Sequence, residues 1–345
     1  MNQQESRNSS MGTHWVGADV GKDAFDVGLV RYDQHYPDTP LCDIPADTFA
    51  CSAQGVQAFV SWLDAQGLGE APVRVVMEAT GDYSINLAVW MLEQRASLAP
   101  AIANPRQTHN FIESMGVRNK TDRLDARALG FYGVERNPMA YETPSPEMAD
   151  LRSLSRYRET LVRQRTALKN QMHKTNACAY VVKDQKKRLR QLNRGIEGVE
   201  KEMKALVDEH SALKGDVELL ISIYGVAFIS ATTILAELGD LRRFERARPL
   251  TAFAGMSPRQ HQSGSSIRGR TRLCKRGNPR IRQCLYLSAM VAIRGDNEFR
   301  QTYQRLLAQG KPRMVALASV MRKMLVVMRA ILISGQPYRP LGISS

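Results

Sequence analysis

The chain has 345 residues, of which 43% are hydrophobic and 24% are charged. This length suits roughly two domains of about 100–200 residues each, and the composition excludes a chain that is disordered throughout. The 48 Lys and Arg residues outnumber 34 Asp and Glu, which gives a net charge of +14 and a pI near 9.7. Such an excess of positive charge favours a polyanionic partner, and nucleic acid is the first candidate.

Residues 1–12 are polar, and we expect them to be disordered. From residue 13 to about residue 142, short β-rich runs alternate with helical stretches. HWVGADV and FDVGLVRY flank a turn at Gly21 and Lys22, whereas residues 56–63 have helical spacing. VRVVMEAT and LAPAIAN are further strand candidates. Strands that alternate with helices predict an α/β sheet domain.

Residues 143–215 lack the strand pattern and predict long helices. Eight positions step alternately by 3 and 4, which is a heptad seam with charges between its members. The seam residues are Leu189, Leu192, Ile196, Val199, Met203, Leu206, His210 and Leu213. A helix hairpin within one chain would use such a seam, and so would a dimer; we favour packing between subunits or domains.

Residues 216–345 form a third, mostly helical region. Residues 242–282 contain twelve Lys and Arg and one acid, Glu245, so they carry +11 and the rest of the chain only +3. Solvated charged faces usually mix both signs, so a one-signed stretch rich in Gly and Ser favours phosphate binding.

Two apolar segments of this third region predict helices. ISIYGVAFISATTILAEL resembles a helix-hairpin-helix, in which a turn offers amides to a DNA phosphate, but Ala227 replaces its usual second glycine. Phosphate contact and simple helix packing therefore both remain open. Residues 314–333 are interrupted by Arg322, Lys323 and Arg329, which favours a buried or partner-packed helix over a membrane span.

The histidines and cysteines do not indicate a zinc site or disulfides. No His is paired with a Cys at zinc-ligand spacing. The five cysteines are odd in number and form no C-x-x-C motif, so we expect reduced thiols in a cytosolic protein.

Four acids are candidates for a divalent-metal site. Asp19 and Glu78 end apolar runs, while Asp122 and Asp125 are three residues apart at a predicted helix start and share one face. Buried carboxylates are costly unless compensated, and Mg²⁺ prefers carboxylate oxygens. Structural alternatives are an N-cap for Asp122, a first-turn position for Asp125, a pairing with arginine for Glu78 and a turn for Asp19.

A serine-rich stretch, QSGSSIRGRTRLCKR, is the other candidate site. Its serines are Ser263, Ser265 and Ser266, and the Lys and Arg residues that follow are Arg268, Arg270, Arg272, Lys275 and Arg276. A serine needs a base or dense positive charge to act as a nucleophile, and arginines can stabilise a phosphoryl transition state. Alternatively, these serines only hydrogen-bond phosphates.

The motifs GADVGKDAFDV, EATGDYS, NKTDRLDARAL and FAGMSPRQHQSGSSIRG, in this order, resemble those of the DEDD transposases of the insertion-sequence family one-ten. The resemblance covers almost the whole chain and extends to the Piv-type invertases. It implies an RNase H-like (RuvC-like) α/β domain over 13–142, a coiled coil between protomers over 143–215, and a mostly α-helical transposase domain over 216–345.

The resemblance also implies a mechanism and partners. The acids Asp19, Glu78, Asp122 and Asp125 would bind Mg²⁺ or Mn²⁺, and Ser263, the first serine of Ser-Gly-Ser-Ser, would attack DNA beside the acidic site of a partner subunit. A structured bridge RNA would pair with target and donor DNA, and the protein would act as a dimer or tetramer in the bacterial cytoplasm. The residues that we expect to contact nucleic acid are Lys120, Arg259, Arg268, Arg270, Arg272, Lys275 and Arg276.

Three other functions compete with RNA-guided recombination. A RuvC-like nuclease or junction resolvase would cut with metal-activated water and would not use Ser263. A non-catalytic nucleic-acid-binding scaffold would tolerate loss of the acids. GADVGK also resembles the first phosphate loop of actin-like ATPases, although its glycine spacing is too short for a Walker loop and no further nucleotide motif follows.

Overall fold

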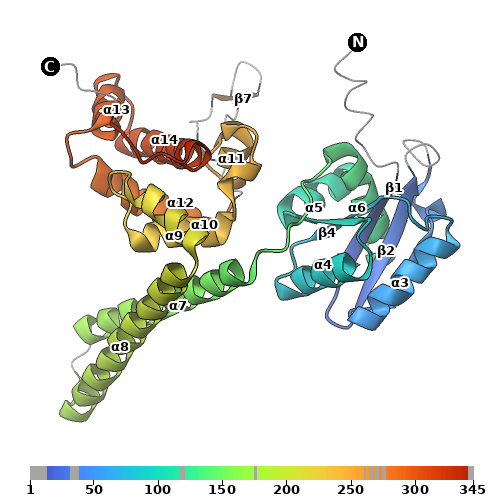
Figure 1. Ribbon diagram of the computed structural model, residues 1–345, viewed down its shortest axis with the longest axis horizontal. Coiled ribbons are helices and arrows are strands. Elements are labelled where there is room, and N and C mark those ends of the chain that lie inside the picture. The colour runs from blue at the N-terminus through green and yellow to red at the C-terminus, as the bar shows by residue number, and fades with distance from the viewer. Residues whose placement is uncertain are drawn as a thin grey trace. The chain divides into compact units, whose positions relative to one another are not determined.

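The computed structural model describes residues 14–31, 39–116, 121–174, 177–259, 262–263, 267–268, 272–273 and 277–340. The predictions for residues 1–12 and for Lys120, Ser265, Ser266, Arg270, Lys275 and Arg276 lie outside these residues. The chain divides into two compact units, Met1–Thr143 and Pro144–Ser345 (Figure 1).

A five-stranded mixed sheet forms the centre of the first unit. The strands are β1 (His14–Val20), β2 (Ala24–Arg31), β3 (Ala46–Ala50), β4 (Val73–Glu78) and β5 (Leu98–Ala103), in the order β3-β2-β1-β4-β5. The first three strands are antiparallel, and β4 and β5 run parallel to β1. Four of these strands were predicted, and the mixed sheet is consistent with the predicted RNase H-like α/β domain.

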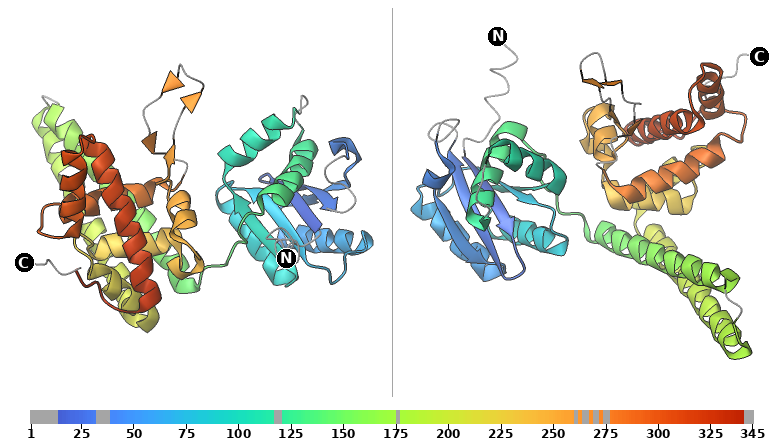
Figure 2. Two further views of the ribbon diagram at one scale, coloured as in Figure 1. Left: turned by 90° about the horizontal axis from the view of Figure 1, so that it is seen from above. Right: turned by 180° about the vertical axis from the view of Figure 1, so that it is seen from behind.

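Helices cover both faces of the sheet (Figure 2). Helices α3 (Ala53–Ala65) and α4 (Asp82–Gln94) bury one face, on which the even-numbered residues of β1 lie. Helices α5 (Pro105–Ser114) and α6 (Asp122–Arg136) bury the other face around Trp15. Because side chains alternate along a strand, Gly17 and Asp19 share the α6 face with Trp15.

Glycines let α6 lie directly on β1 and β2. A Cβ on Gly17 would overlap the carbonyl oxygen of Ala126, and one on Gly28 would lie 2.6 Å from the Cα of Arg127. In the helix itself, a Cβ on Gly133 would overlap the ring of Trp15. The backbones therefore approach more closely than any side chain would allow.

The second unit is almost entirely helical. Helices α7 (Pro146–Lys174) and α8 (Ala179–Glu209) form a long hairpin, and the remaining helices build a bundle that shares its core. These helices are α9 (Ser211–Ile221), α10 (Phe228–Leu238), α11 (Ala247–Phe253), α12 (Pro279–Ala292), α13 (Glu298–Ala308) and α14 (Arg313–Ser334). Two short 3-10 helices are Leu41–Asp43 in the first unit and Leu241–Arg243 in the second.

The heptad seam packs within the chain. Ile196, Val199 and Met203 of α8 are buried in the same core as Leu151 and Leu161 of α7. The structure therefore favours the hairpin alternative over our preferred packing between subunits or domains, because these seam residues already have partners on α7.

The bundle contains the predicted glycine turn at Gly225 and the predicted apolar helix near the C-terminus. Gly225 joins α9 to α10 with φ of 84°, and a Cβ there would lie 2.8 Å from the backbone N of Ala292. Close packing on α12 thus accounts for this glycine without a DNA phosphate. Helix α14 is buried along Leu317–Met328 as predicted, and Arg329 donates to the carbonyl oxygen of Phe244 at 2.6 Å.

In the described part of the chain, none of the helices combines the length and hydropathy needed to cross a bilayer. The described cysteines, Cys42, Cys51, Cys178 and Cys284, are free thiols.

Replacing Gly17 with Ala should destabilise the first unit by about 1–3 kcal/mol, because the added methyl group must push α6 off the sheet. All three tryptophans, Trp15, Trp62 and Trp90, belong to this unit, so tryptophan fluorescence during urea unfolding reports the effect. Gly69→Ala is the control, since a Cβ at Gly69 meets no atom within 4 Å. An unchanged unfolding midpoint for Gly17→Ala would contradict this account of the packing.

Candidate functional site

The first two predicted acids lie at one edge of the sheet. Asp19 is the penultimate residue of β1 and Glu78 the last residue of β4, and these parallel neighbours are in register up to Ala18 and Met77. Glu78 is two residues after Val76, which is buried under α5 and α6. Alternation therefore places both carboxylates on the face that α6 covers.

The other two acids come from the first turn of α6. The N-cap is Thr121, whose Oγ1 accepts a hydrogen bond from the backbone N of Leu124 at 3.3 Å. The alternative that Asp122 caps this helix is therefore wrong, because Asp122 is the first helical residue. Asp122 and Asp125 are three residues apart and share one face of the helix.

Electrostatics shows that the four acids form one neighbourhood. The pKa of Asp19 is raised to about 6, first by burial and then by the negative charges of Asp122, Asp125, Glu78 and Asp26. A carboxylate held among other carboxylates is harder to ionise. The arrangement thus concentrates negative charge at a partly buried point, as expected at functional sites.

Asp26 is a fifth carboxylate that the sequence analysis missed. It pairs with Asp19 across the antiparallel β1–β2 ladder, accepts a hydrogen bond from Thr48 Oγ1 at 2.6 Å and lies 3.7 Å from Arg123 Nε. Both acids flank the predicted turn at Gly21 and Lys22, two residues before it and four residues after it, and this proximity was the available signal. Its two partners partly compensate its charge.

Thr108 holds Glu78 in place. This fully buried threonine lies on α5, and its hydroxyl donates a hydrogen bond to Glu78 Oε1. The same hydroxyl lies 2.9 Å from the carbonyl oxygen of Pro105. The observed partner of Glu78 is thus this hydroxyl, and the sequence contains no pattern that points to Thr108.

The acid cluster fits a divalent cation by its donor chemistry. All five groups offer carboxylate oxygens, the ligands that Mg²⁺ prefers, and a cation would relieve the repulsion that raises the pKa of Asp19. Among the described residues, no three Asp, Glu, His or Cys side chains are already positioned as a metal centre. Ion binding would therefore have to draw these carboxylates together.

The described residues of the predicted serine loop form two short strand pairs in the second unit, hereafter the ribbon. Strand β6 (Pro258–Arg259) pairs with β9 (Arg272–Leu273), and β7 (Gln262–Ser263) pairs with β8 (Ile267–Arg268). Ser263 is the last residue of β7 and is in register with Ile267. The backbone positions of Arg259, Arg268 and Arg272 lie on the strands of the same ribbon.

Gly255 and Gly277, which flank the ribbon in the sequence, lie against each other. A Cβ on Gly255, whose φ is 70°, would lie 2.6 Å from the backbone N of Gly277. Arg282 donates to the carbonyl oxygen of Gly277, which fixes the returning strand at the start of α12. The two glycines thus allow the ends of the ribbon to touch.

A buried ionic network lies next to the point where Gly277 leads into α12. Glu237 of α10 accepts hydrogen bonds from Arg156 Nε at 2.8 Å and from Asn278 Nδ2 at 2.6 Å. Burial would raise the pKa of Glu237, but Arg156, Asn278 and Arg280 outweigh it and hold the pKa below its ordinary value. The network connects α7 and α10 to Asn278, which follows the ribbon in the sequence.

Some of the positive charge in residues 242–282 is neutralised locally. Arg242 lies 2.6 Å from Asp216 and 3.2 Å from Asp240, and Arg280 lies 2.6 Å from Glu159. The expectation that the whole segment offers its charge to phosphates is therefore too broad.

Comparison with known proteins relates this chain to transposases and to a DNA-inverting protein. Residues 16–175 match the DEDD_Tnp_IS110 family, described as "Transposase", and residues 217–304 match the "Transposase IS116/IS110/IS902 family". The chain is 26% identical to the pilin gene-inverting protein of Moraxella bovis over 95% of its length and 98% of that protein. It is also 26% identical to the transposase for insertion sequence element IS1111A of Coxiella burnetii, over 64% of the chain and 66% of that protein.

Replacing Asp19 with Asn should stabilise the metal-free chain at pH 7.5. The folded-state pKa of Asp19 is raised from 3.8 to about 6, so the folded state holds the extra proton and loses stability as pH rises from about 4 through 6. Asn removes this loss, and each kcal/mol recovered should raise Tm by about 2–4 °C. Thermal unfolding in EDTA tests this, with the advantage vanishing at pH 4.

The control for this substitution is Asp64→Asn, at an exposed carboxylate paired with Arg95. It should give no stabilisation at either pH. A Tm of Asp19→Asn that is equal to or below the wild-type Tm at pH 7.5 would show that the acids do not destabilise one another.

Replacing Thr108 with Val should weaken Mn²⁺ binding about 10-fold, because Glu78 loses the donor that orients it. Isothermal titration of the full chain with Mn²⁺ measures the change in Kd. Thr232→Val is the matched control, since Thr232 is equally buried but lies in α10 of the second unit. Identical affinities for Thr108→Val and wild type would exclude this positioning role.

Proposed function

Because this chain belongs to the IS110/IS116/IS902 family of transposases and is a DNA transposase or recombinase, we propose that it exchanges DNA strands through a serine nucleophile assisted by a divalent metal ion. The nucleophile is Ser263. The observation that carries the proposal is the convergence of carboxylates on Asp19 at the edge of an RNase H-like sheet.

The proposed metal ligands are Asp19, Glu78, Asp122 and Asp125, and the proposed ion is Mg²⁺ or Mn²⁺. DEDD transposases generally use a divalent metal, which when bound would polarise the scissile phosphate and stabilise the leaving oxygen. The chain itself supplies ionised carboxylates, and Thr108 fixes the orientation of one of them. Since the pKa of Asp19 is about 6, metal binding strengthens as pH rises through that value.

Strand exchange would proceed in two phosphoryl transfers. In the first, Ser263 Oγ loses its proton and bonds to phosphorus, while the bond from phosphorus to one deoxyribose oxygen breaks and that oxygen takes up a proton. In the second, a hydroxyl of another strand loses its proton and bonds to phosphorus, while the bond from phosphorus to Ser263 Oγ breaks and Oγ takes up a proton. The acids and Ser263 belong to different units of the chain, and the family resemblance is the support for a site in which one subunit supplies the acids and its partner the serine.

We further propose that a bridge RNA selects the donor and target DNA in the bacterial cytoplasm. The support is the family resemblance together with composition: aromatic residues are only 7% of the chain, whereas its net charge is +14. Affinity would then come mainly from phosphates rather than from base stacking. The basic residues on the ribbon strands, Arg259, Arg268 and Arg272, are proposed to contact these phosphates, as are Lys120, Arg270, Lys275 and Arg276.

DNA inversion is a second candidate outcome of the same chemistry. It is favoured by the relative that matches over 98% of its own length, which is named for inverting a pilin gene. Inversion and transposition differ in whether the exchanged sites lie on one DNA molecule. A supercoiled plasmid with two inverted sites, analysed beside separate donor and target plasmids, distinguishes the two.

Ser263→Ala should abolish a covalent protein–DNA adduct that wild type forms with donor DNA, target DNA, element RNA and Mg²⁺. The adduct is detected by labelled DNA that remains bound to protein after denaturation. Ser265→Ala and Ser266→Ala should retain it, which fixes the nucleophile among the three. Ser257→Ala, just before the ribbon, is the control for local disruption.

Other results of this assay would favour the competing functions. Metal-dependent nicking without an adduct, equal in wild type and Ser263→Ala, would identify a nuclease or resolvase. DNA binding with neither nicking nor adduct, unaffected by Asp122→Asn or Asp125→Asn, would identify a non-catalytic scaffold.

A further inference from the structure

Positive charge is concentrated at a second place, which the sequence analysis did not separate from the rest of the chain. Residues 160–194, the distal part of the α7–α8 hairpin, contain ten Lys and Arg and one acid, Asp184, for a net charge of +9. Together with the +11 of residues 242–282, this leaves −6 for all other residues. The hairpin is thus a separate basic region.

Five of these cations form one stripe along α8. They are Lys183, Lys186, Lys187, Arg190 and Arg194, hereafter the basic stripe. At about 100° per residue, they fall within an arc of about 100°. The seam residues that pack on α7, such as Ile196 and Val199, lie on the opposite side of the helix.

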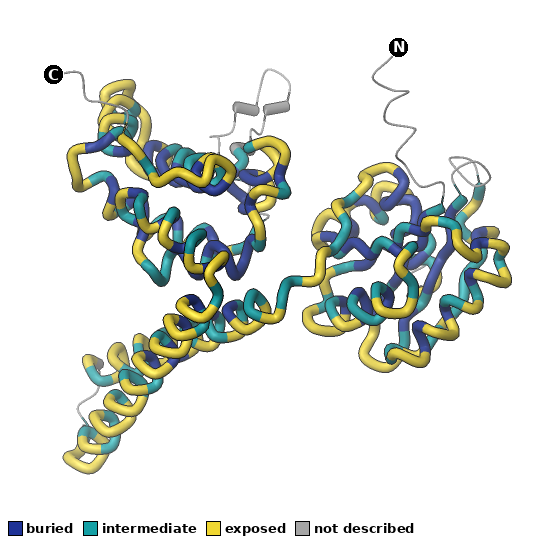
Figure 3. The backbone as a smooth tube through the Cα atoms, viewed as in Figure 1, coloured by how far each residue is buried: buried dark blue, intermediate teal, exposed yellow. Residues whose placement is uncertain are grey.

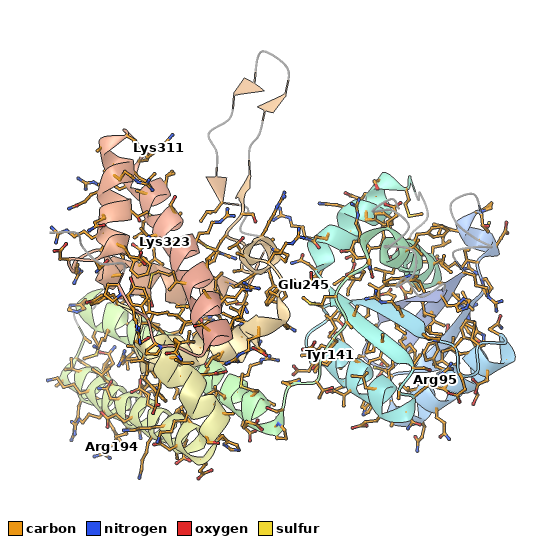
Figure 4. All side chains as sticks on the ribbon, turned by 45° about the horizontal axis from the view of Figure 1, so that its top comes forward. Arg95, Tyr141, Arg194, Glu245, Lys311 and Lys323 are labelled. Atoms are coloured by element: carbon orange, nitrogen blue, oxygen red, sulfur yellow. The ribbon has the colours of Figure 1, made fainter. Side chains whose placement is uncertain are left out.

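The basic stripe is exposed, and no acid of the described residues forms an ion pair with it. All five residues are exposed, and the distal hairpin is largely exposed along its outer surface (Figure 3). The cations of this region with recorded ion pairs are Arg163 with Glu159 and Arg188 with Asp184; no ion pair of a stripe residue is recorded among the described residues. Arg194 lies on the outside of the hairpin (Figure 4).

The same helix changes character immediately after the stripe. Residues 195–209 contain five acids and only two cations, Lys201 and Lys204. These lysines lie on the same helical face as the stripe but are flanked on it by Glu197 and Asp208. Solvated helix surfaces usually mix both signs in this way, so the one-signed stripe requires a different explanation.

We propose that the basic stripe binds the phosphate backbone of duplex DNA outside the site of strand exchange. Its five charges span about 17 Å of helix axis, and duplex DNA presents about one phosphate charge per 1.7 Å of its own axis. Lys and Arg contact phosphates without reading sequence, and no aromatic residue lies between Lys183 and Arg194 for stacking on unpaired bases. The inference rests on the proposed function only in that DNA is the partner.

The test measures binding of the full-length chain to a fluorescent DNA duplex of arbitrary sequence, in EDTA, by anisotropy over a range of salt concentrations. The variant carries Lys183→Gln, Lys186→Gln, Lys187→Gln, Arg190→Gln and Arg194→Gln. Gln has a helix propensity close to that of Lys and Arg, so circular dichroism should show an unchanged helix content. The control, Lys201→Gln with Lys204→Gln, removes charge from the same helical face.

We expect the five-site variant to lose at least about 10-fold in DNA affinity at moderate salt, with a salt dependence shallower by about 1 for each phosphate contact removed. The control should match wild type. Equal affinities for the five-site variant and wild type would overturn the proposal. So would a loss confined to a structured RNA, or a loss of self-association with DNA binding intact.

Failure of this inference is distinguishable from failure of the proposed function. If the five-site variant loses duplex binding while wild type forms no adduct, the stripe stands and the serine mechanism falls. If wild type forms the adduct and the five-site variant binds DNA unchanged, the serine mechanism stands and the stripe proposal falls.

Discussion

A carboxylate cluster can form at the edge of this sheet because the backbone of α6 lies directly against β1 and β2 at Gly17 and Gly28. Gly17 and Gly28 remove the Cβ atoms on the strand side, and Gly133 leaves room for the ring of Trp15 on the helix side. The same contact sets how near the first turn of α6 comes to Asp19. A larger residue at any of these glycines would displace the helix and with it two of the acids.

This packing has an electrostatic cost that the chain offsets only in part. Burial and neighbouring carboxylates raise the pKa of Asp19, while Arg123 and Thr48 compensate the charge of Asp26. Negative charge at the first turn of α6 is favoured by the helix dipole, but only modestly. A divalent cation would satisfy the remaining charge, so the interaction that weakens the metal-free fold is also what would give the site its affinity for metal.

Local patterns in the sequence predicted four of the five strands of the first unit, the helix around residues 56–63 and the helix start at Asp122, because strand alternation and helix starts are local signals. Asp26 and Thr108 depend on contacts across a turn and between elements, which a one-dimensional pattern does not specify. The ribbon that carries Ser263 was expected only as a loop, since two-residue strands have no alternation to detect. The α8 seam was ambiguous because α7 and a second subunit would present the same kind of apolar partner.

The proposed mechanism requires the acid cluster and Ser263 to act together in one site built from two subunits. Mixing Asp19→Ala chains with Ser263→Ala chains, under conditions that allow subunit exchange, tests it directly. Neither variant alone should form the protein–DNA adduct, but the mixture should regain it, because one pairing combines intact acids with an intact serine. A mixture that exchanges subunits yet stays inactive would contradict the shared site.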